Sequence, residues 1–388
     1  MDIMAAAAKH ADYLLKMRHY FHAHPELSGK EYNTSQKIKD ELDKMGIPWK
    51  DCGMETGILA EIKGQKPGKT ILLRADMDAL PVEELTGFSF ASENNGIMHA
   101  CGHDCHMSML LTAARILQDI KEDLPGTVRL AFQPAEETGE GAKAMIACGA
   151  LEGVDGFFGM HVWSGIPSGK IYADEGPCMA SCDQFTIDIH GKGGHGATPH
   201  LCVDAVTVTG AIINSLQTVV SREISPVDPA VVTIGTIKAG DRWNVVAEHS
   251  TLEGTTRCFS REVRQQLPQA IQRIAEETGK AYRADVKLTY NFIVGPTIND
   301  GPMSQLVYGA AAKVVNPEPR YNFGLNMVGE DMAYFLDEVP GAIALLGVGN
   351  EKCGAVYPHH SGHFCVDESA LIKGAMLYAQ TAVDFNGK

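Results

Sequence analysis

Strand and helix patterns alternate in the first and last parts of this chain, and this alternation limits the possible folds more than any other feature. Met107–Ile120 has the small and apolar residues of a buried helix, and Thr127–Phe132 has the composition of a strand. Near the carboxyl end, Gly341–Val348 is a continuous apolar run and Glu368–Phe385 has helical periodicity. Strands that alternate with helices are typical of a parallel sheet. We therefore predict an α/β fold in which a mostly parallel sheet is flanked by helices.

The middle of the chain has a different pattern. Gln184–His190 alternates apolar and polar residues, as a half-buried strand does. Helix, strand, strand, helix and strand patterns follow in turn, at 203–220, 230–238, 251–258, 261–278 and 284–290. The order βαββαβ favours a ferredoxin-like α+β sheet with helices on one face. We therefore predict one domain made of residues 1–182 and 292–388, and a domain inserted at 183–291 that would act as a lid or in dimerisation.

The composition excludes several classes of protein. The formal net charge of −15 disfavours a nucleic-acid partner, because an acidic surface repels phosphates. The amino-terminal sequence lacks a basic segment followed by a long apolar one, and no apolar run reaches the ~18–20 residues of a membrane span. The 10 cysteines are irregularly spaced, unlike a disulfide framework. We expect a cytoplasmic protein with reduced thiols and no membrane partner.

The segment 99–106, with the sequence HACGHDCH, is the densest cluster of soft metal ligands in the chain. Cys101 and His103 lie just before a predicted helix, whose amino terminus favours a thiolate. A thiolate and an imidazole together suit zinc, manganese, cobalt or nickel. Taken alone, the segment is equally compatible with a loop that carries a buried cysteine and surface histidines.

Three further clusters of ligand-type side chains follow predicted strands. Glu136 and Glu137 follow one strand, His161 follows another, and three histidines between residues 359 and 363 follow the apolar run near the carboxyl end. Neighbouring carboxylates in an extended segment point in different directions, so one could bind metal while the other acts as a base. Ligand sites of open α/β sheets gather outside the carboxyl ends of the strands. The four clusters together predict a metal site at one edge of the sheet.

Six short segments resemble the motifs of the M20 metallopeptidase superfamily and occur in the same order. They are HPELS (24–28), LRADMDALP (73–81), HACGHDCH (99–106), QPAEE (133–137), GMH (159–161) and GKGGH (191–195). The resemblance runs from about residue 15 to residue 385. The branch that it resembles most contains aminoacylases, hippurate hydrolases and auxin-conjugate hydrolases.

The resemblance implies a pair of divalent metal ions, either zinc, manganese, cobalt or nickel, in the domain 1–182 and 292–388. The implied metal ligands are Cys101, His103, Glu137, His161 and His360. Cys101 would bridge the two ions, and Glu136 would be the general base. The family pattern has a proline where this chain has Gly362, which leaves His359 and His363 as alternatives to His360.

The resemblance also implies residues that contact the substrate. His195 resembles the histidine that stabilises the oxyanion, while Asn244 and Arg257 resemble positions that hold the substrate carboxylate. A guanidinium suits this role because it binds a carboxylate through two hydrogen bonds. An ion pair on a strand face is the alternative for Arg257.

Two acidic residues are expected in supporting roles. Asp104 is expected to orient His103, as a hydrogen-bond partner commonly does for a metal-binding histidine. Arg74 stands where other branches of the superfamily carry a metal-binding histidine, so Asp76 is expected to support the site rather than to bind metal.

These groups predict an amidohydrolase that cleaves the amide bond of N-acyl amino acids with a metal-activated water. A bound metal lowers the pKa of its water and polarises the carbonyl group, and Glu136 would transfer the proton. The nearest alternative is a metallo-carboxypeptidase or dipeptidase on the same scaffold. The substrate is expected to be a small N-acyl amino acid or peptide-like molecule, and the acyl group is left open because fold does not determine it.

Two rival interpretations come from other classes of protein. A thiol redox protein would use Cys101 and Cys105, but their spacing is not that of a C-x-x-C motif. A binding module without catalysis is disfavoured by the presence of Glu136. We expect a homodimer or higher homo-oligomer, because two-fold dimers are the commonest assembly.

Overall fold

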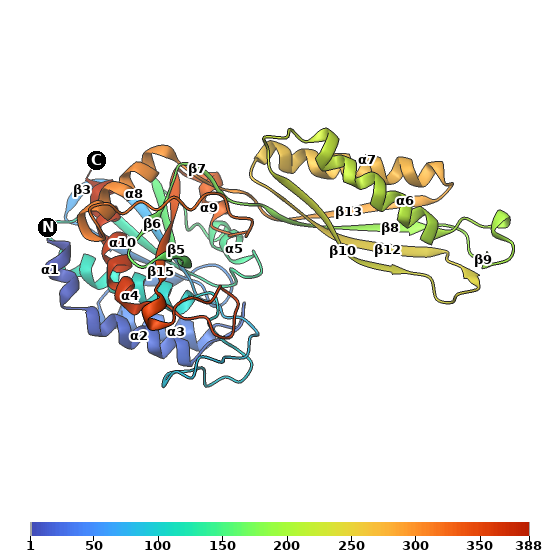
Figure 1. Cartoon of the computed structure of the whole chain (residues 1–388). Helices are drawn as coiled ribbons and strands as arrows, with labels where there is room; N and C mark the ends of the chain where they lie inside the picture. The colour runs from blue at the N-terminus through green and yellow to red at the C-terminus, as the bar shows by residue number, and fades with distance from the viewer. Residues whose placement is uncertain (1, 388) are drawn as a thin grey trace. The chain divides into compact units, whose positions relative to one another are not determined.

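The computed structural model describes residues 2–387 and forms two compact units (Figure 1). Unit 1 comprises the residues up to Gly176, Ile298–Gly324 and the residues from Asp331 onward. Unit 2 comprises Pro177–Thr297 and the short segment Leu325–Glu330. The boundaries predicted at 183 and 291 fall a few residues inside unit 2, and the segment at 325–330 had no recognisable signal in the sequence.

Unit 1 is built on a seven-stranded sheet with the order β1-β2-β4-β3-β5-β15-β6. Its strands are β1 (Trp49–Asp51), β2 (Ile58–Lys63), β3 (Lys66–Asp76), β4 (Pro125–Gln133), β5 (Gly156–Pro167), β6 (Ile171–Tyr172) and β15 (Gly341–Gly349). The neighbours β4, β3, β5 and β15 are parallel, whereas β1, β2 and β6 pair antiparallel. The predicted α/β class is confirmed, but the sheet is mixed. At one edge β1 is antiparallel to β2 because a short loop joins them, which cannot make a parallel crossover.

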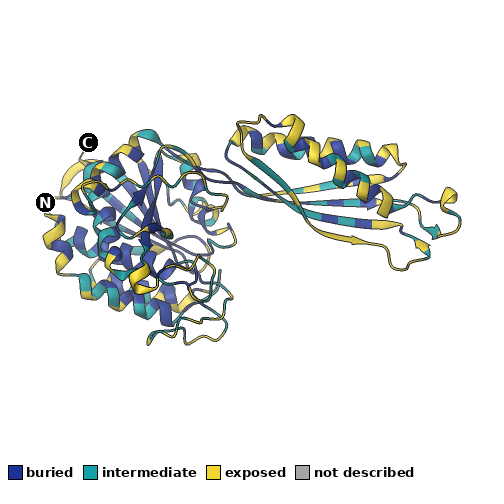
Figure 2. Cartoon of the chain, in the orientation of Figure 1, coloured by how far each residue is buried: buried dark blue, intermediate teal, exposed yellow. Residues whose placement is uncertain are grey.

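Helices cover both faces of this sheet. They are α1 (Ile3–Ala8), α2 (Ala11–Ala23), α3 (Tyr32–Lys44), α4 (His103–Asp119), α5 (Gly141–Ala147), α8 (Gly301–Val314), α9 (Ala333–Glu338) and α10 (Leu371–Asn386). The helices α4 and α10 pack on β3, α2 packs on α4, and α8 packs on α10 and β15. The buried residues concentrate in this region (Figure 2). Ile71, Leu73 and Ala75 of β3 belong to the main hydrophobic core. The residues that alternate with them, such as Arg74, face the other side of the sheet. Polar side chains can therefore occupy that side near the carboxyl end of β3.

Unit 2 contains an antiparallel sheet with the order β10-β12-β8-β13. In chain order its elements are β8 (Cys182–His190), α6 (Ala205–Thr218), β10 (Ala230–Ala239), β12 (His249–Cys258), α7 (Arg261–Ala281) and β13 (Asp285–Val294). The hydrophobic side chains of β8, Phe185, Ile187 and Ile189, pack in one cluster with residues of α6 and α7. The residues that alternate with them lie on the open face, as the period of two requires.

The remaining elements are short. They are β7 (Gly176–Met179), β9 (Gly194–His195), β11 (Val245–Val246), β14 (Thr297–Asn299) and the helical turns η1 (Pro199–Leu201), η2 (Val219–Glu223), η3 (Glu351–Cys353) and η4 (Glu368–Ala370). Within residues 2–387, every helix is too short or too polar to cross a lipid bilayer.

Candidate metal centre

The residues predicted as metal ligands come from four segments of unit 1 and lie close together. They form two groups of three, and within each group the candidate ligand atoms lie within 4.8 Å of one another. One group is Cys101, His103 and His161, and the other is Cys101, Glu137 and His360. The predicted set is therefore brought together, with Cys101 common to both groups.

Gly102 determines how Cys101 and His103 are presented. Its φ of +91° is left-handed, and a Cβ at this position would lie 2.5 Å from Cγ2 of Val162. Helix α4 begins at His103, one turn earlier than the periodicity predicted. His103 therefore occupies the first turn of α4, and Cys101 lies directly before the helix.

His161 lies inside β5 and not after the end of a strand as predicted. The strand continues to Pro167 because β15 keeps pairing with it beyond His161. The Nδ1 atom of His161 donates to the backbone oxygen of Val162 at 2.6 Å, and its Nε2 lies 3.4 Å from Sγ of Cys101. Burial, with a smaller effect of the nearby imidazole of His106, lowers the pKa of His161 well below its ordinary value. A neutral imidazole has a lone pair available for a metal ion.

His103 is oriented by Asp78, not by Asp104 as predicted. Its Nδ1 donates to the backbone oxygen of Asp78 at 2.8 Å and lies 3.2 Å from the Asp78 carboxylate. The carboxylate of Asp104 instead accepts from Nδ1 of His22 at 2.9 Å and from Nε of Arg18 at 3.2 Å. The prediction for Asp104 is wrong because consecutive side chains of a helix point about 100° apart.

Asp78 also fixes the segment that carries the two glutamates. Its carboxylate accepts from the backbone N–H groups of Glu136 and Glu137, at 3.2 and 3.1 Å, and from the hydroxyl of Ser28 at 2.7 Å. Sequence reasoning missed this role. The signal was the spacing from Asp76, because residues i and i+2 of an extended chain lie on the same face.

Two buried polar atoms at the centre have no hydrogen-bond partner among residues 2–387, Nε2 of His103 and Oε1 of Glu137. They lie 4.0 Å apart. Burial lowers the pKa of His103, but the carboxylates of Asp76 and Asp78 outweigh that effect and raise the pKa to about 10. The negative charge of the carboxylates that hold a proton on His103 also attracts a metal cation. The thiolate, imidazole and carboxylate donors fit a divalent metal ion.

Asp76 and His106 contact each other, and Asp76 also contacts the candidate ligand His103. Asp76 accepts from Nη1 of Arg74 and from Nδ1 of His106, both at 2.6 Å, and lies 3.5 Å from Nε2 of His103. Nε2 of His106 accepts from the backbone N–H of Val162 at 2.9 Å, which ties α4 to β5. His106 was not predicted, although its position three residues after His103 places both on one face of the helix.

Glu136 lies beside the same histidine. Its Oε2 is 4.0 Å from Nε2 of His103, and its Oε1 accepts from the backbone N–H of Asp331 at 3.4 Å. The preceding Ala135 has a left-handed φ of +52° and donates its N–H to the buried carboxylate of Glu31 at 3.0 Å. Such a conformation is costly outside glycine and is found mainly where the surroundings enforce it. The turn thus brings both neighbouring glutamates toward His103.

Of the three histidines in the 359–363 loop, His360 is the one that joins a ligand group of the described chain. Its Nε2 lies 3.5 Å from Oε1 of Glu137. The ring of His359 packs against Trp163, at 4.7 Å between centroids, and His363 bonds the backbone of another loop. The geometry therefore favours His360 over the two alternatives.

Gly362 is required by close packing of its loop. Its backbone oxygen accepts from the N–H of Leu85 at 2.7 Å, and a Cβ at this position would lie 2.4 Å from the backbone oxygen of Glu83. The departure from the proline of the family pattern therefore has a local steric reason.

The three residues expected to contact the substrate lie in unit 2. His195 is exposed in β9, and Asn244 directly precedes β11, which pairs with β9. Strand β12 begins at His249, which pairs with the last residue of β8, just before the segment that carries β9. Arg257 lies eight residues farther along β12, roughly 26 Å from His249 at ~3.3 Å per residue. A single copy of unit 2 therefore does not place Asn244 and Arg257 on the same carboxylate. Oδ1 of Asn244 and Nη1 of Arg257 are buried atoms without a hydrogen-bond partner among residues 2–387.

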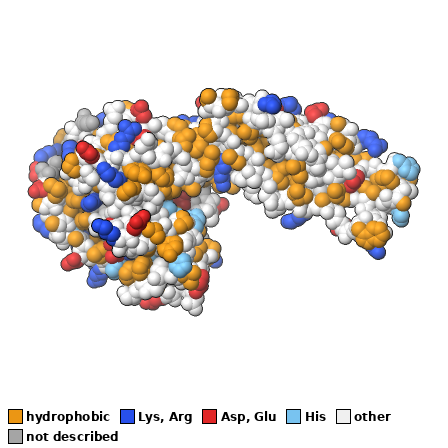
Figure 3. Space-filling model, viewed as in Figure 1, with side chains coloured by type: hydrophobic (Ala, Val, Ile, Leu, Met, Phe, Trp, Pro, Cys, Tyr) orange, Lys and Arg blue, Asp and Glu red, His pale blue; other side chains and the backbone are white. Residues whose placement is uncertain are grey.

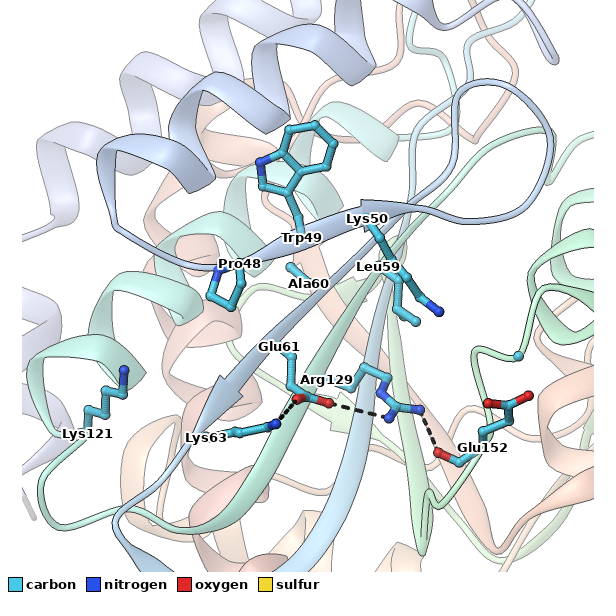
Figure 4. Close-up of a pocket in the computed structure, with 11 residues that line it drawn as sticks. Pro48, Trp49, Lys50, Leu59, Ala60, Glu61, Lys63, Lys121, Arg129 and Glu152 are labelled. Carbon is cyan, nitrogen blue, oxygen red and sulfur yellow. Dashed lines mark hydrogen bonds and ion pairs between the residues drawn. The ribbon is translucent and has the colours of Figure 1, made fainter.

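A hollow of about 550 Å³ also occurs in unit 1, but none of its lining residues belongs to the ligand groups. It lies over β1, β2 and β4 (Figure 4). Arg129 within it is bonded to Glu61 at 3.4 Å and to the backbone oxygen of Glu152 at 2.8 Å. These contacts give Arg129 a structural role in joining β4 to its neighbours.

The chain belongs to the peptidase family M20/M25/M40, which it matches over residues 72–384. It is 41% identical to thermostable carboxypeptidase 1 of Saccharolobus solfataricus, over 97% of this chain and 96% of the relative. It is 39% identical to N-acetyl-L-cysteine deacetylase of Bacillus subtilis, over 95% and 87%. Among solved structures, the YXEP protein of Bacillus subtilis, a dinuclear metal binding peptidase from the M20 family, has a TM-score of 0.86 and 36% identity, over 97% and 98%. The predicted membership of the M20 superfamily is confirmed.

Proposed function

We propose that this chain is a two-metal amidohydrolase that removes the acyl group from N-acyl amino acids. The observation that carries the proposal is the pair of ligand groups that share Cys101, with Glu136 beside them. The deacetylase relative supports an acylated amino acid as the substrate class.

Cys101, His103, Glu137, His161 and His360 would hold the two ions. The mixture of sulfur, nitrogen and oxygen donors suits zinc, manganese, cobalt or nickel. Bound divalent ions would polarise the scissile carbonyl group and lower the pKa of a water molecule. Nε2 of His103 and Oε1 of Glu137 support a role as ligands, because buried polar atoms are rarely left without a hydrogen bond.

Glu136 would act as the general base. It would take a proton from the attacking water and return it to the nitrogen of the leaving amine, so that no charged amide anion has to leave. A proton-transfer group of this kind contributes ~10²–10⁴-fold to the rate. The hydrogen bond from the N–H of Asp331 holds one oxygen of Glu136 in place.

Unit 2 would supply the groups that recognise the substrate. His195 would donate to the developing oxyanion, a contribution typically worth ~3 kcal/mol, while Asn244 and Arg257 would bind a carboxylate. The partnerless Oδ1 of Asn244 and Nη1 of Arg257 support a ligand at each position. The separation of these two residues within unit 2 means that they would not both contact the same carboxylate from one copy.

Unit 2 would also form a homodimer interface. Exposed hydrophobic side chains are visible on its surface (Figure 3). The exposed hydrophobic side chains of unit 2 include Trp243, which is 91% exposed, with Leu201, Val206, Ile237 and Val245. The edge strand β10 is free to pair with another strand. A two-fold dimer would cover both features.

The second candidate is a metallo-carboxypeptidase, which is favoured by the 41% identity to a carboxypeptidase. An assay of N-acetyl and N-benzoyl amino acids beside dipeptides, with and without a chelator, separates the two. We expect N-acyl amino acids to be cleaved faster and the chelator to abolish turnover. A preference for dipeptides would favour the carboxypeptidase instead.

The Glu136→Gln variant tests the catalytic assignment. It should retain its metal ions and lose ~10²-fold or more in kcat, whereas Glu140→Gln, an exposed control in the same loop, should behave as wild type. Normal turnover by Glu136→Gln would overturn the assignment. A wild-type protein that holds metal but cleaves nothing would indicate a binding module.

A further inference from the structure

Two histidines face each other across neighbouring strands of unit 2. His190 is the last residue of β8 and His249 is the first residue of β12, and the two are in register. Their Nδ1 atoms lie 2.9 Å apart, and the rings are nearly perpendicular, with centroids 4.8 Å apart. Both residues are exposed.

A carboxylate lies next to this pair. Asp285, the first residue of β13, is in register with His190 on the other side of β8. Residues directly opposite each other on neighbouring strands point to the same face, with Cβ atoms ~4.5–5.5 Å apart. His249, His190 and Asp285 therefore form a row across three strands, on the face opposite the hydrophobic side chains Phe185, Ile187 and Ile189 of β8.

The spacing of the two Nδ1 atoms fits a shared metal ion. An ion bound to two imidazole nitrogens at ~2.0–2.1 Å, with an angle of about 90° between the bonds, separates those nitrogens by about 2.9 Å. A right angle is typical of the tetragonal geometry of copper(II) and nickel(II), whereas a tetrahedral ion would push the nitrogens farther apart. The present contact requires a proton on one nitrogen and a lone pair on the other, so an ion would replace that proton.

From this geometry we propose that His190 and His249 form a surface binding site for a divalent transition-metal ion of the nickel or copper type, with Asp285 as a third ligand once its side chain turns toward the pair. The side chains of His190 and His249 hydrogen-bond to each other, and all three residues of the row are exposed to solvent. Two imidazoles and one carboxylate, with the remaining positions taken by water, suit these ions. The net charge of −15 would favour the approach of a cation. The site is separate from the ligand groups of unit 1 and contains no thiolate.

The experiment uses the full-length protein after loading with zinc and removal of the excess by dialysis. Nickel is then titrated in by calorimetry, and nickel per chain is measured by elemental analysis. The wild type should bind one nickel ion per chain that His190→Asn and His249→Asn do not bind. His200→Asn, which removes an exposed histidine of unit 2 outside the row, should retain this ion. Asp285→Asn should weaken its binding ~10-fold or more.

The comparison between variants decides the proposal. Nickel that replaces zinc in unit 1 would add the same amount to every protein. It would therefore cancel in the difference between the histidine variants and the His200→Asn control. Circular dichroism would check that the exposed substitutions leave the fold intact. If His190→Asn and His249→Asn bind as much nickel, with the same affinity, as His200→Asn, the site does not exist.

Discussion

The Nδ1 atom of His103 lies 2.8 Å from the backbone oxygen of Asp78 and 3.2 Å from its carboxylate. The same carboxylate accepts the backbone N–H groups of Glu136 and Glu137. One buried aspartate therefore positions two candidate metal ligands, His103 and Glu137, together with the candidate general base Glu136.

The substitution Asp78→Asn should weaken metal binding and lower kcat/KM, each by ~10–100-fold. An asparagine has one carbonyl oxygen where Asp78 has two, so it cannot accept from both glutamate amides and from Ser28. Metal affinity would be measured by competition with a chelator, and kcat/KM with the best N-acyl amino acid. Asp104→Asn is the control, because its partners are Arg18 and His22 and not His103. An equal loss of metal affinity in the control would contradict this account.

Arg74→Met should lower the free energy of unfolding by about 3–5 kcal/mol, because it leaves two buried carboxylates without their cation. Arg74 is fully buried and contacts Asp76 at 2.6 Å and Asp331 at 2.8 Å. Burial raises the pKa of Asp331 to about 6 even with Arg74 present. Chemical denaturation of the wild type, Arg74→Met and Arg74→Lys would measure the effect, with a smaller loss for lysine. A loss below about 1 kcal/mol for Arg74→Met would show that the carboxylates simply become protonated.

Local sequence was sufficient to predict much of the fold and to single out the segments that carry the candidate ligands. Apolar runs and periodicity located the strands and helices of both units, since burial imposes those periods directly. Cys101 and His103 could be singled out because two soft ligands and a helix start fall within a few residues. In these cases the physical cause lies within one segment.

The errors arise where the cause lies in distant segments. The length of β5, and with it the position of His161, depends on pairing with β15, about 180 residues later. The contacts of Asp104 with Arg18 and His22 join positions more than 80 residues apart. A helix start does not reveal that His103 will face the distant Asp78 and not its neighbour Asp104.

The stability of unit 1 should depend on Glu41 in a defined pH range. Glu41 is buried and bonded to Lys37 at 2.9 Å and to Lys44 at 2.8 Å. Burial raises its pKa, but the lysines outweigh that effect and lower it from 4.5 to about 2. Because the pKa is lower in the folded state, the stabilisation is complete above about pH 4.5 and is lost as the pH falls toward 2.

The variant Glu41→Gln should therefore be less stable than the wild type by about 1–2 kcal/mol at pH 7, a value reduced because Lys44 is largely exposed. The difference should shrink toward zero near pH 2. Thermal unfolding of both proteins across this range would measure it. A difference that does not change with pH would rule out the ion pairs as its source.

Gly362→Ala should destabilise the loop that carries His360, by about 1–3 kcal/mol for a steric conflict of this kind. The added Cβ would lie 2.4 Å from a backbone oxygen of Glu83, which has little freedom to move. Metal affinity should fall as well, because His360 is two residues away. Gly309→Ala in α8 is the matched control, since no atom lies within 4 Å of its Cβ and alanine favours a helix. Unchanged stability and metal affinity in Gly362→Ala would show that the loop tolerates the side chain.

The most direct test of the dinuclear centre is the number of divalent ions per chain in the wild type and in Cys101→Ser. Both proteins would carry His190→Asn, so that the surface histidine pair does not contribute, and would be equilibrated with zinc or manganese before elemental analysis. Because Cys101 belongs to both ligand groups, we expect two ions per chain in the parent and at most one in Cys101→Ser. A parent that saturates at one ion, or a Cys101→Ser protein that holds two with unchanged affinity, would contradict the account.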